Sequence, residues 1–112
     1  FGDVGPYTRR GGFDGVGQAL SGAMYITGTP GEPAKAAAPY VDFSTAVLSA
    51  FGALAALIER DRSGQGQRVD ATLLGTALAV FNSHLIEYAN IREQCALVHE
   101  GLMKAATAKA KP

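Results

Sequence analysis

The carboxylate of Asp42 is the side chain that is best placed for chemistry. It lies in the stretch YVDFSTAV, just before the most apolar run of the chain, Ala46–Ile58, which contains no charged residue. Aspartate is a preferred N-cap, because its oxygen accepts a hydrogen bond from the free N–H groups that begin a helix. The same place keeps a carboxylate ionised, since the helix dipole favours an anion there. Local sequence therefore favours a cap at Asp42 and leaves open a charged nucleophile or base.

Two glycine-rich stretches have the composition of phosphate-binding loops, but their residues do not follow the order of a known phosphate-binding motif. Residues 11–17 read GGFDGVG, which differs from the GxGxxG of a dinucleotide site, and no predicted strand precedes them. Residues 63–67 read SGQGQ and lack the Lys-Ser/Thr pair of a P-loop. We interpret both stretches as turns and as glycines that allow close packing.

Cys95 and His99 lie four residues apart, on one face of a predicted helix, as two metal ligands do. A zinc site takes three or four ligands, and the only other histidine is His84. We therefore predict no metal site. The single cysteine excludes an internal disulfide and is typical of a protein from a reducing compartment.

The bulk composition is that of one small domain that can form a core. The chain has 112 residues, of which 47% are hydrophobic and 18% charged. Ten basic and ten acidic residues give zero net charge, so the basic footprint of a nucleic-acid-binding protein is missing. No signal peptide is visible, and the run Ala46–Ile58 is shorter than the roughly 20 residues of a membrane span. We expect a cytoplasmic protein without a nucleic-acid or membrane partner.

Hydrophobic spacing predicts a mostly helical chain. Helical spacing covers Phe13–Ile26, where three glycines favour close packing on their side of the helix. A second helix runs from Asp42 into ERDRSGQG, where Gly64 suits a C-cap and two arginines suit the helix terminus. A short strand is predicted around Gln67–Val69, and a third helix from about Ala71 to Glu87.

The helix that begins at Asp42 is apolar or small on every side, which is typical of a helix buried in a larger fold. Its large apolar residues recur every three or four positions: Phe43, Val47, Phe51, Leu54 and Ile58. Residues 90–106 continue as a helix with weaker patterning, before an Ala/Lys tail. The chain begins at Phe1 within a Gly/Pro-rich segment, so we expect a piece of a longer protein.

Four stretches, taken in order, resemble the class III (CaiB/BaiF-type) coenzyme A transferase family, which includes formyl-CoA and carnitine-CoA transferases and α-methylacyl-CoA racemases. They are FGDVGPYTRRGGFDGVGQALSG, TGTPGEP, PYVDFSTA and GALAALIERDRSGQGQRVDATLLGTAL. The resemblance implies an α/β fold, of which this chain would be a mostly helical piece with one short strand. Residues 1–89 would belong to the Rossmann-like large domain, with residues 90–112 an unassigned helical extension and tail.

The resemblance also implies a function, which is the transfer of CoA from an acyl-CoA thioester to a free carboxylic acid. Asp42 falls at the family's catalytic aspartate, which attacks the thioester carbonyl and passes through a mixed anhydride and an aspartyl-CoA thioester. Arg10 is a candidate contact for the CoA phosphate or pantetheine. Coenzyme A is a substrate here, and no permanently bound cofactor is expected. Family enzymes are several times longer and form interlocked homodimers, so we expect the 112-residue chain alone to be inactive.

Two alternatives stay open. The racemase branch resembles this chain at GGFDGV but carries a histidine base where Phe13 stands. Because a phenyl ring cannot move a proton, the transferase is preferred over the racemase. The other alternative is a non-catalytic helical interaction module, in which Asp42 only caps its helix.

Overall fold

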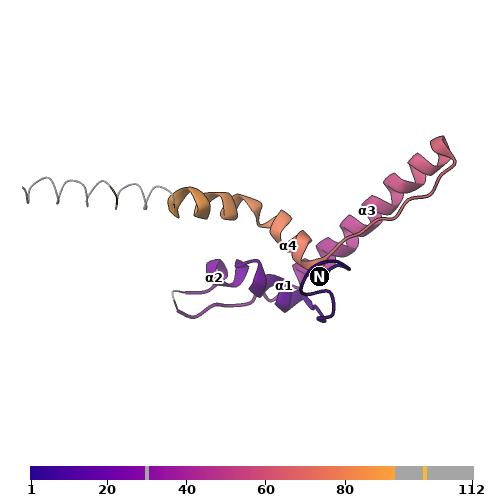
Figure 1. Cartoon of the computed structure of the whole chain (residues 1–112). Helices are drawn as coiled ribbons and strands as arrows, with labels where there is room; N and C mark the ends of the chain where they lie inside the picture. The colour runs from indigo at the N-terminus through magenta and orange to yellow at the C-terminus, as the bar shows by residue number, and fades with distance from the viewer. Residues whose placement is uncertain (30, 93–99, 101–112) are drawn as a thin grey trace, which may run out of the picture. The chain divides into compact units, whose positions relative to one another are not determined.

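The computed structural model describes residues 1–29, 31–92 and residue 100. The chain divides into two compact units, the first of which is Phe1–Phe81 and the second of which starts at Asn82. The first unit contains the labelled helices of Figure 1, which are α1 (Asp14–Leu20), α2 (Ala23–Thr27), α3 (Tyr40–Ser63) and α4 (Leu73–Val80). In the second unit, residues 82–92 are helical. The prediction of a mostly helical chain is confirmed.

Helix formation over Phe13–Ile26 is confirmed, but the predicted single helix is divided in two. The helix is interrupted between α1 and α2 at Gly22, whose φ is +84°. A residue with a side chain rarely adopts that conformation, whereas glycine adopts it freely. The side chain of Ser21 donates a hydrogen bond to the Gln18 carbonyl at 3.1 Å, which closes the end of α1.

Helix α3 begins two residues before Asp42 and ends where the sequence predicts. Its N-cap position is Pro39, which offers no side-chain hydrogen bond, and its last turn carries Arg60 and Arg62. Gly64 follows with a φ of +73°, and its N–H donates to the Arg60 carbonyl at 2.8 Å. The predicted glycine C-cap is therefore confirmed.

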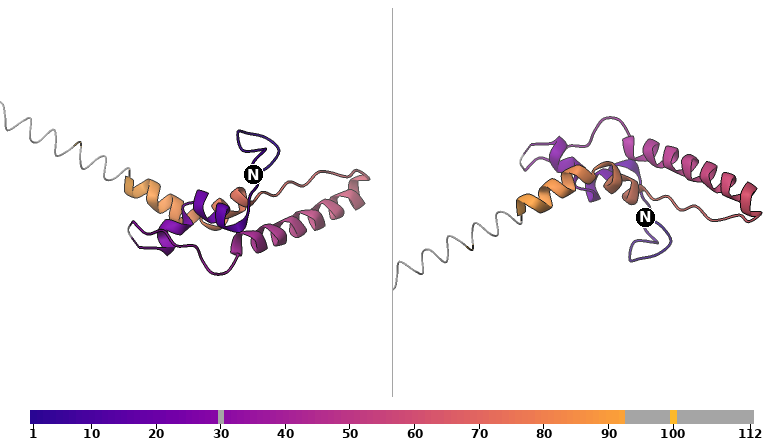
Figure 2. Two further views of the ribbon diagram at one scale, coloured as in Figure 1. Left: turned by 90° about the horizontal axis from the view of Figure 1, so that it is seen from below. Right: turned by 90° about the horizontal axis from the view of Figure 1, so that it is seen from above.

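The strand predicted around Gln67–Val69 is not found. Apart from a single bridge between Thr29 and Glu32, the described residues contain no β-structure, and residues 65–72 have no regular secondary structure. Figures 1 and 2 show this segment running back alongside α3. Its contact with the helix is close, since a Cβ on Gly52 would lie 2.6 Å from Val69 Cγ1. A strand needs a neighbouring strand for its ladder of hydrogen bonds, and here the neighbour is a helix.

Helix α4 begins with a local cap. The Thr72 hydroxyl accepts a hydrogen bond from the Gly75 N–H at 3.0 Å, and the helix ends at Val80. The helix predicted from Ala71 to Glu87 is therefore interrupted at Phe81, which lies in a turn. Of the helical extension predicted over residues 90–106, residues 93–99 and 101–106 lie outside the described part of the chain.

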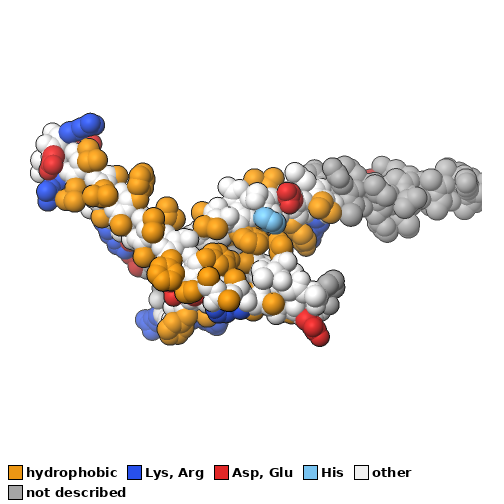
Figure 3. All heavy atoms as spheres, turned by 180° about the vertical axis from the view of Figure 1, so that it is seen from behind, with side chains coloured by type: hydrophobic (Ala, Val, Ile, Leu, Met, Phe, Trp, Pro, Cys, Tyr) orange, Lys and Arg blue, Asp and Glu red, His pale blue; other side chains and the backbone are white. Residues whose placement is uncertain are grey.

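The core of the first unit is small, and most of α3 is exposed. The buried apolar residues are Ala23, Val41 and Ala77. The large apolar side chains of α3 stay mostly accessible: Phe43 is 68% exposed, Phe51 70% and Leu54 61%. Figure 3 shows apolar side chains gathered along this helix. A helix of this composition requires an apolar cover, which the described residues do not supply to it.

Helix α3 is also long and apolar enough to cross a membrane, judged by length and composition alone. It has 24 residues, with a mean hydropathy of 1.8 over its most apolar window. It exceeds the length expected from the run Ala46–Ile58 because it begins at Tyr40. The central helix of a larger soluble protein has the same length and composition, so these two properties do not assign a membrane.

Candidate active site

Asp42 is the third residue of α3 and lies in its first turn. Its side chain is exposed and makes no hydrogen bond to any described residue. The prediction that Asp42 caps α3 is therefore wrong, because the helix has already begun at Tyr40, with Pro39 in the cap position. The first turn of α3, which carries Asp42, lies at the positive end of the helix dipole.

The carboxylate that caps α3 belongs to Asp14 of α1. Its Oδ1 accepts a hydrogen bond from the Val41 N–H at 2.9 Å, across 27 residues of sequence. The backbone N–H of Asp42 also donates to this carboxylate. Asp14 is only 5% exposed, and Val41 is completely buried. The residue that begins α3 is thus held by another helix and not by its own sequence.

Two further side chains hold Asp14 in place. Gln18 donates from Nε2 to Asp14 Oδ2 at 2.6 Å, and its Oε1 accepts from the Ala36 N–H at 2.8 Å. Lys35 Nζ lies 3.4 Å from the same Asp14 Oδ2. We call Asp14, Gln18 and Lys35 the Asp14 cluster. The cluster joins α1, the segment before α3 and the first turn of α3.

The hydrogen bonds of the cluster keep Asp14 charged despite its burial. Burial raises the pKa of the Asp14 carboxyl, but the bonds from Val41, Gln18, Lys35 and Asp42 outweigh burial and lower the pKa below its ordinary value. Burial, together with the negative charge of Asp14, raises the pKa of Tyr40. The Tyr40 hydroxyl is buried and has no hydrogen-bond partner among the described residues.

Close packing reinforces the same junction between helices. A Cβ on Gly17 of α1 would lie only 2.8 Å from Cγ1 of Val41. The predicted close packing on the glycine side of this helix is therefore confirmed. The residue that precedes Asp42 is fixed by its backbone hydrogen bond to Asp14 and by its side chain against Gly17.

Arg10, the predicted CoA contact, lies in the exposed N-terminal segment. Its guanidinium stands over the Tyr7 ring, with 5.0 Å between Cζ and the ring centroid. Arg68 ties this segment to the stretch before α4, because its guanidinium binds both Asp3 and Asp70. Among the described residues, the structure records no contact between Arg10 and Asp42.

Among the residues that the structure describes, the other predicted positions bring no additional chemistry to Asp42. Phe13, at the histidine position of the racemase branch, is the N-cap residue of α1 and is 76% exposed. Cys95 and His99 lie outside the described residues, and His84 Nδ1 lies 3.2 Å from the Ser83 hydroxyl. Within the described ranges, no group of three or more His, Cys, Asp or Glu residues is placed to hold a metal ion.

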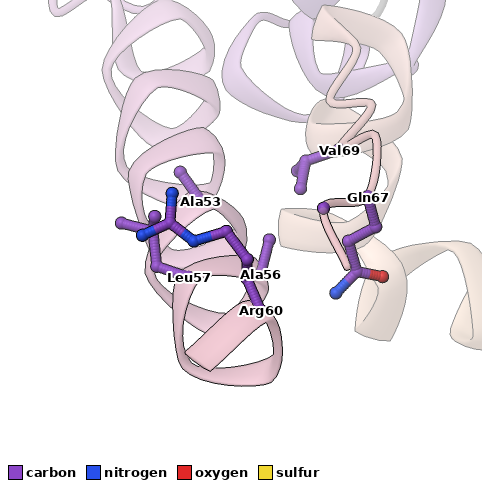
Figure 4. Close-up of a pocket in the computed structure, with 7 residues that line it drawn as sticks. Ala53, Ala56, Leu57, Arg60, Gln67 and Val69 are labelled. Atoms are coloured by element: carbon purple, nitrogen blue, oxygen red, sulfur yellow. The ribbon is translucent and has the colours of Figure 1, made fainter. Parts of the chain in front are cut away.

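A groove of about 400 Å³ lies between the C-terminal half of α3 and the segment that runs back along it. Figure 4 shows its lining residues, which are Ala53, Ala56, Leu57, Arg60, Gly66, Gln67 and Val69. No carboxylate lines it, and its residues on α3 begin eleven positions after Asp42. The groove is therefore separate from the candidate catalytic residue.

Sequence reasoning missed all three members of the Asp14 cluster. A usable signal was present, since Asp14 and Gln18 are polar residues four positions apart and lie beside Gly17 on one face of a helix. That face is the buried one, whereas Val16 and Leu20 of the apolar spacing are 36% and 50% exposed. The spacing of apolar residues predicted the helix but did not predict which face of α1 is buried against the rest of the unit.

Comparison with known proteins identifies the family that this chain resembles. The sequence profile of CoA-transferase family III matches residues 1–110. Succinyl-CoA--D-citramalate CoA-transferase of Chloroflexus aurantiacus is 41% identical over 98 residues, which is 84% of this chain and 24% of that protein. Succinate--glutarate CoA-transferase of Agrobacterium fabrum is 42% identical over 89 residues, covering 79% of this chain and 22% of that protein.

A solved structure gives the same result. A CAIB/BAIF family protein from Brucella suis superposes with a TM-score of 0.75 at 35% identity, over 80% of this chain and 24% of the other. The chain thus spans about a quarter of the length of each of these relatives. It belongs to CoA-transferase family III, whose characterised relatives are enzymes that transfer CoA.

Proposed function

We propose that the protein carrying this chain is a class III CoA-transferase, which moves CoA from an acyl-CoA thioester to a free carboxylic acid. Asp42 is the nucleophile in this proposal. The observation that carries it is the family match over residues 1–110. The geometry supports it, because Asp42 lies exposed in the first turn of a helix whose start is fixed by Asp14. An exposed carboxylate on a fixed backbone can approach a bound thioester without first leaving a partner.

The proposed reaction proceeds in balanced steps. An Asp42 carboxylate oxygen attacks the thioester carbonyl, the C–S bond breaks, and the CoA thiolate leaves behind a mixed anhydride. The thiolate then attacks the Asp42 carbonyl of the anhydride, which releases the donor acid and forms an aspartyl-CoA thioester. The acceptor carboxylate attacks this thioester and expels the thiolate, giving a second anhydride. Attack of the thiolate on the acceptor's acyl carbon restores Asp42 and yields the new acyl-CoA.

A carboxylate suits this exchange because both of its acyl derivatives are reactive. An anhydride is a stronger acyl donor than a thioester, so each step has a good leaving group. A serine or threonine at the same position would form an ordinary ester and halt the exchange. The thiolate released in the first step is the nucleophile of the second, so the cycle has no net uptake or release of protons.

The rest of the proposal concerns the complete protein. Coenzyme A enters and leaves as part of the substrates, and Arg10 contacts its phosphate or pantetheine. The described helices form part of a Rossmann-like α/β domain, in which the segment around Gln67–Val69 pairs with strands outside this chain. The complete protein acts in the cytoplasm as an interlocked homodimer. The exposed apolar surface of α3 supports this arrangement, because a larger assembly would cover it.

Covalent trapping on the complete protein tests the proposal. Succinyl-CoA is the first donor to try, because several relatives are named as transferases that use it. The enzyme is incubated with succinyl-CoA and quenched with hydroxylamine, which converts an aspartyl thioester or anhydride to a hydroxamate. Mass spectrometry of the peptide that contains Asp42 is expected to show this modification. The variant Asp42→Ala is expected to lose both the modification and the transfer activity.

The matched control is Asp61→Ala, which removes an exposed carboxylate from the far end of the same helix. It is expected to keep full activity. An unmodified Asp42 in an active enzyme, together with full activity of Asp42→Ala, would rule the proposal out. The racemase alternative predicts deuterium from solvent at the acyl α-carbon in the absence of any acceptor acid. The interaction-module alternative predicts neither activity nor an adduct.

A further inference from the structure

We propose that Asp14 is a positioning residue for the transfer reaction, acting through the first turn of α3 to hold Asp42 in place for attack. This inference rests on the proposed function of Asp42. Asp14 does not touch the substrate in this proposal. Its role is to fix the backbone from which the nucleophile projects, so that the exposed carboxylate reaches a bound thioester in one orientation.

The first step of the argument is that α3 has no cap of its own. Pro39 occupies the cap position and provides no hydrogen-bonding side chain. Without Asp14, the Val41 N–H would be a buried donor with no partner, which would destabilise the start of α3. The hydrogen bond from Val41 to Asp14 Oδ1, at 2.9 Å, meets this need. The start of the helix therefore depends on a residue from α1.

The second step is that the capping carboxylate is itself held rigidly. Gln18 binds Asp14 Oδ2 at 2.6 Å and is only 1% exposed. The other end of the Gln18 amide is fixed by the Ala36 N–H, so the amide cannot turn without losing a bond. A rotation of Asp14 would also break its ion pair with Lys35. The orientation of the Asp14 carboxylate is thus fixed by Gln18 of α1 and by Lys35 of the segment before α3.

The third step is the contrast between a fixed backbone and an accessible side chain. Val41, immediately before Asp42, is completely buried against Gly17. The Asp42 side chain is exposed and has no hydrogen-bond partner among the described residues. Its orientation therefore comes from the backbone, and the backbone of this turn is held by Asp14. Displacement of a reacting group by about 1 Å costs about 100-fold in rate.

The Asp14 cap also limits what the start of α3 can contribute to the reaction. Free N–H groups at a helix N-terminus bind anions and stabilise oxyanions, but Asp14 already occupies the Val41 N–H. That N–H is unavailable to the oxyanion that forms when Asp42 attacks.

The test is steady-state and single-turnover kinetics of the complete protein with succinyl-CoA and an acceptor acid. In Asp14→Ala we expect kcat, expressed per active site titrated by the burst of succinate release, to fall about 100-fold. The KM for succinyl-CoA is expected to change less than about threefold, because Asp14 makes no substrate contact. Formation of the Asp42 adduct in a single turnover is expected to slow as much as kcat. A purely structural role would lower the number of titrated sites and leave the rate per site unchanged.

The variant Asp14→Asn provides a second test in case Asp14→Ala does not fold. It keeps the shape and one acceptor oxygen for the Val41 N–H, while the NH2 group that replaces Oδ2 is a donor and cannot accept from Gln18. We expect an intermediate loss of kcat and faster hydrogen exchange in the peptide that spans residues 39–45. Asp61→Asn is the matched control and is expected to retain wild-type kinetics and exchange.

The outcomes separate this inference from the proposed function. Wild-type kcat per titrated site in both Asp14 variants, with Asp42→Ala inactive, would overturn the positioning role and leave the nucleophile in place. A rise in KM with unchanged kcat would also overturn it, because that result indicates a substrate contact. Full activity of Asp42→Ala would remove the proposed function, and the positioning role with it.

Discussion

Replacing Gly17 by alanine tests whether the contact between α1 and the start of α3 is as close as the structure shows. The added Cβ would lie 2.8 Å from Val41 Cγ1, whereas carbon atoms in contact lie about 3.5–4.0 Å apart. Val41 is completely buried and β-branched, so it has little freedom to turn aside. The substitution therefore requires α1 or the first turn of α3 to shift.

The size of the effect follows from two opposing contributions. Overpacking a filled site costs about 1–3 kcal/mol. Alanine is favoured over glycine within a helix by about 1 kcal/mol, which offsets part of that cost. Gly15 provides a matched control in the same helix, because its added Cβ meets only the flexible side chain of Lys35, at 3.3 Å from Cδ and 3.6 Å from Cε. The helix preference cancels between the two variants, so Gly17→Ala should be less stable than Gly15→Ala by about 1–3 kcal/mol.

Hydrogen exchange measured by mass spectrometry suits this prediction, because it reports local opening. The peptide that covers residues 39–45 contains the Val41 N–H, which donates to Asp14. In Gly17→Ala this peptide should exchange at least about five times faster than in Gly15→Ala, as expected for a loss of 1 kcal/mol or more. Equal exchange in the two variants, or greater protection in Gly17→Ala, would refute the close contact and the fixed helix start that depends on it.

Three further predictions concern helix ends and the buried carboxylate. Thr72→Val removes the cap of α4 and should lower the free energy of unfolding in urea by about 1 kcal/mol, whereas Thr72→Ser should retain it. Gly64→Ala forces a side chain into a backbone with φ of +73°, at a cost of about 1–2 kcal/mol, whereas Gly66→Ala meets no neighbour within 4 Å and should cost less. The lowered pKa of Asp14 stabilises the folded state above the ordinary carboxyl pKa of about 4, and this contribution is lost as the pH falls through the lowered value. The free energy of unfolding in urea should therefore fall between pH 6 and pH 2, and it should fall less in Asp14→Asn than in the wild type. An equal fall in the two proteins would contradict the lowered pKa of Asp14.

The features that could be predicted from the sequence are those fixed by neighbouring residues. The end of α3 is an example, since Arg60, Arg62 and Gly64 determine it within one turn. The close packing on the glycine side of α1 also followed from residue type. The helix end has its cause within a few positions, and the small size of glycine predicts close packing on its side without identifying the partner, which is Val41.

The features that could not be predicted depend on residues far apart in the chain. Asp42 had the residue type and position of a cap, yet Asp14 performs that role from 27 residues away. The segment around Gln67–Val69 has the composition of a strand, but in this structure it lies along a helix and pairs with no described strand. Local sequence patterns do not identify the partner in either case, because hydrogen-bond partners far apart in the chain leave no mark on neighbouring residues.

The long-range cap on α3 also has a consequence for protein engineering. A synthetic peptide of α3 alone would lack the acceptor for its Val41 N–H and would unwind at the end that carries Asp42. Grafting that helix into another scaffold would carry over the reactive carboxylate without the support that orients it. The smallest transplantable unit is discontinuous, and comprises the first turn of α3 together with Asp14, Gln18 and the segment around Lys35.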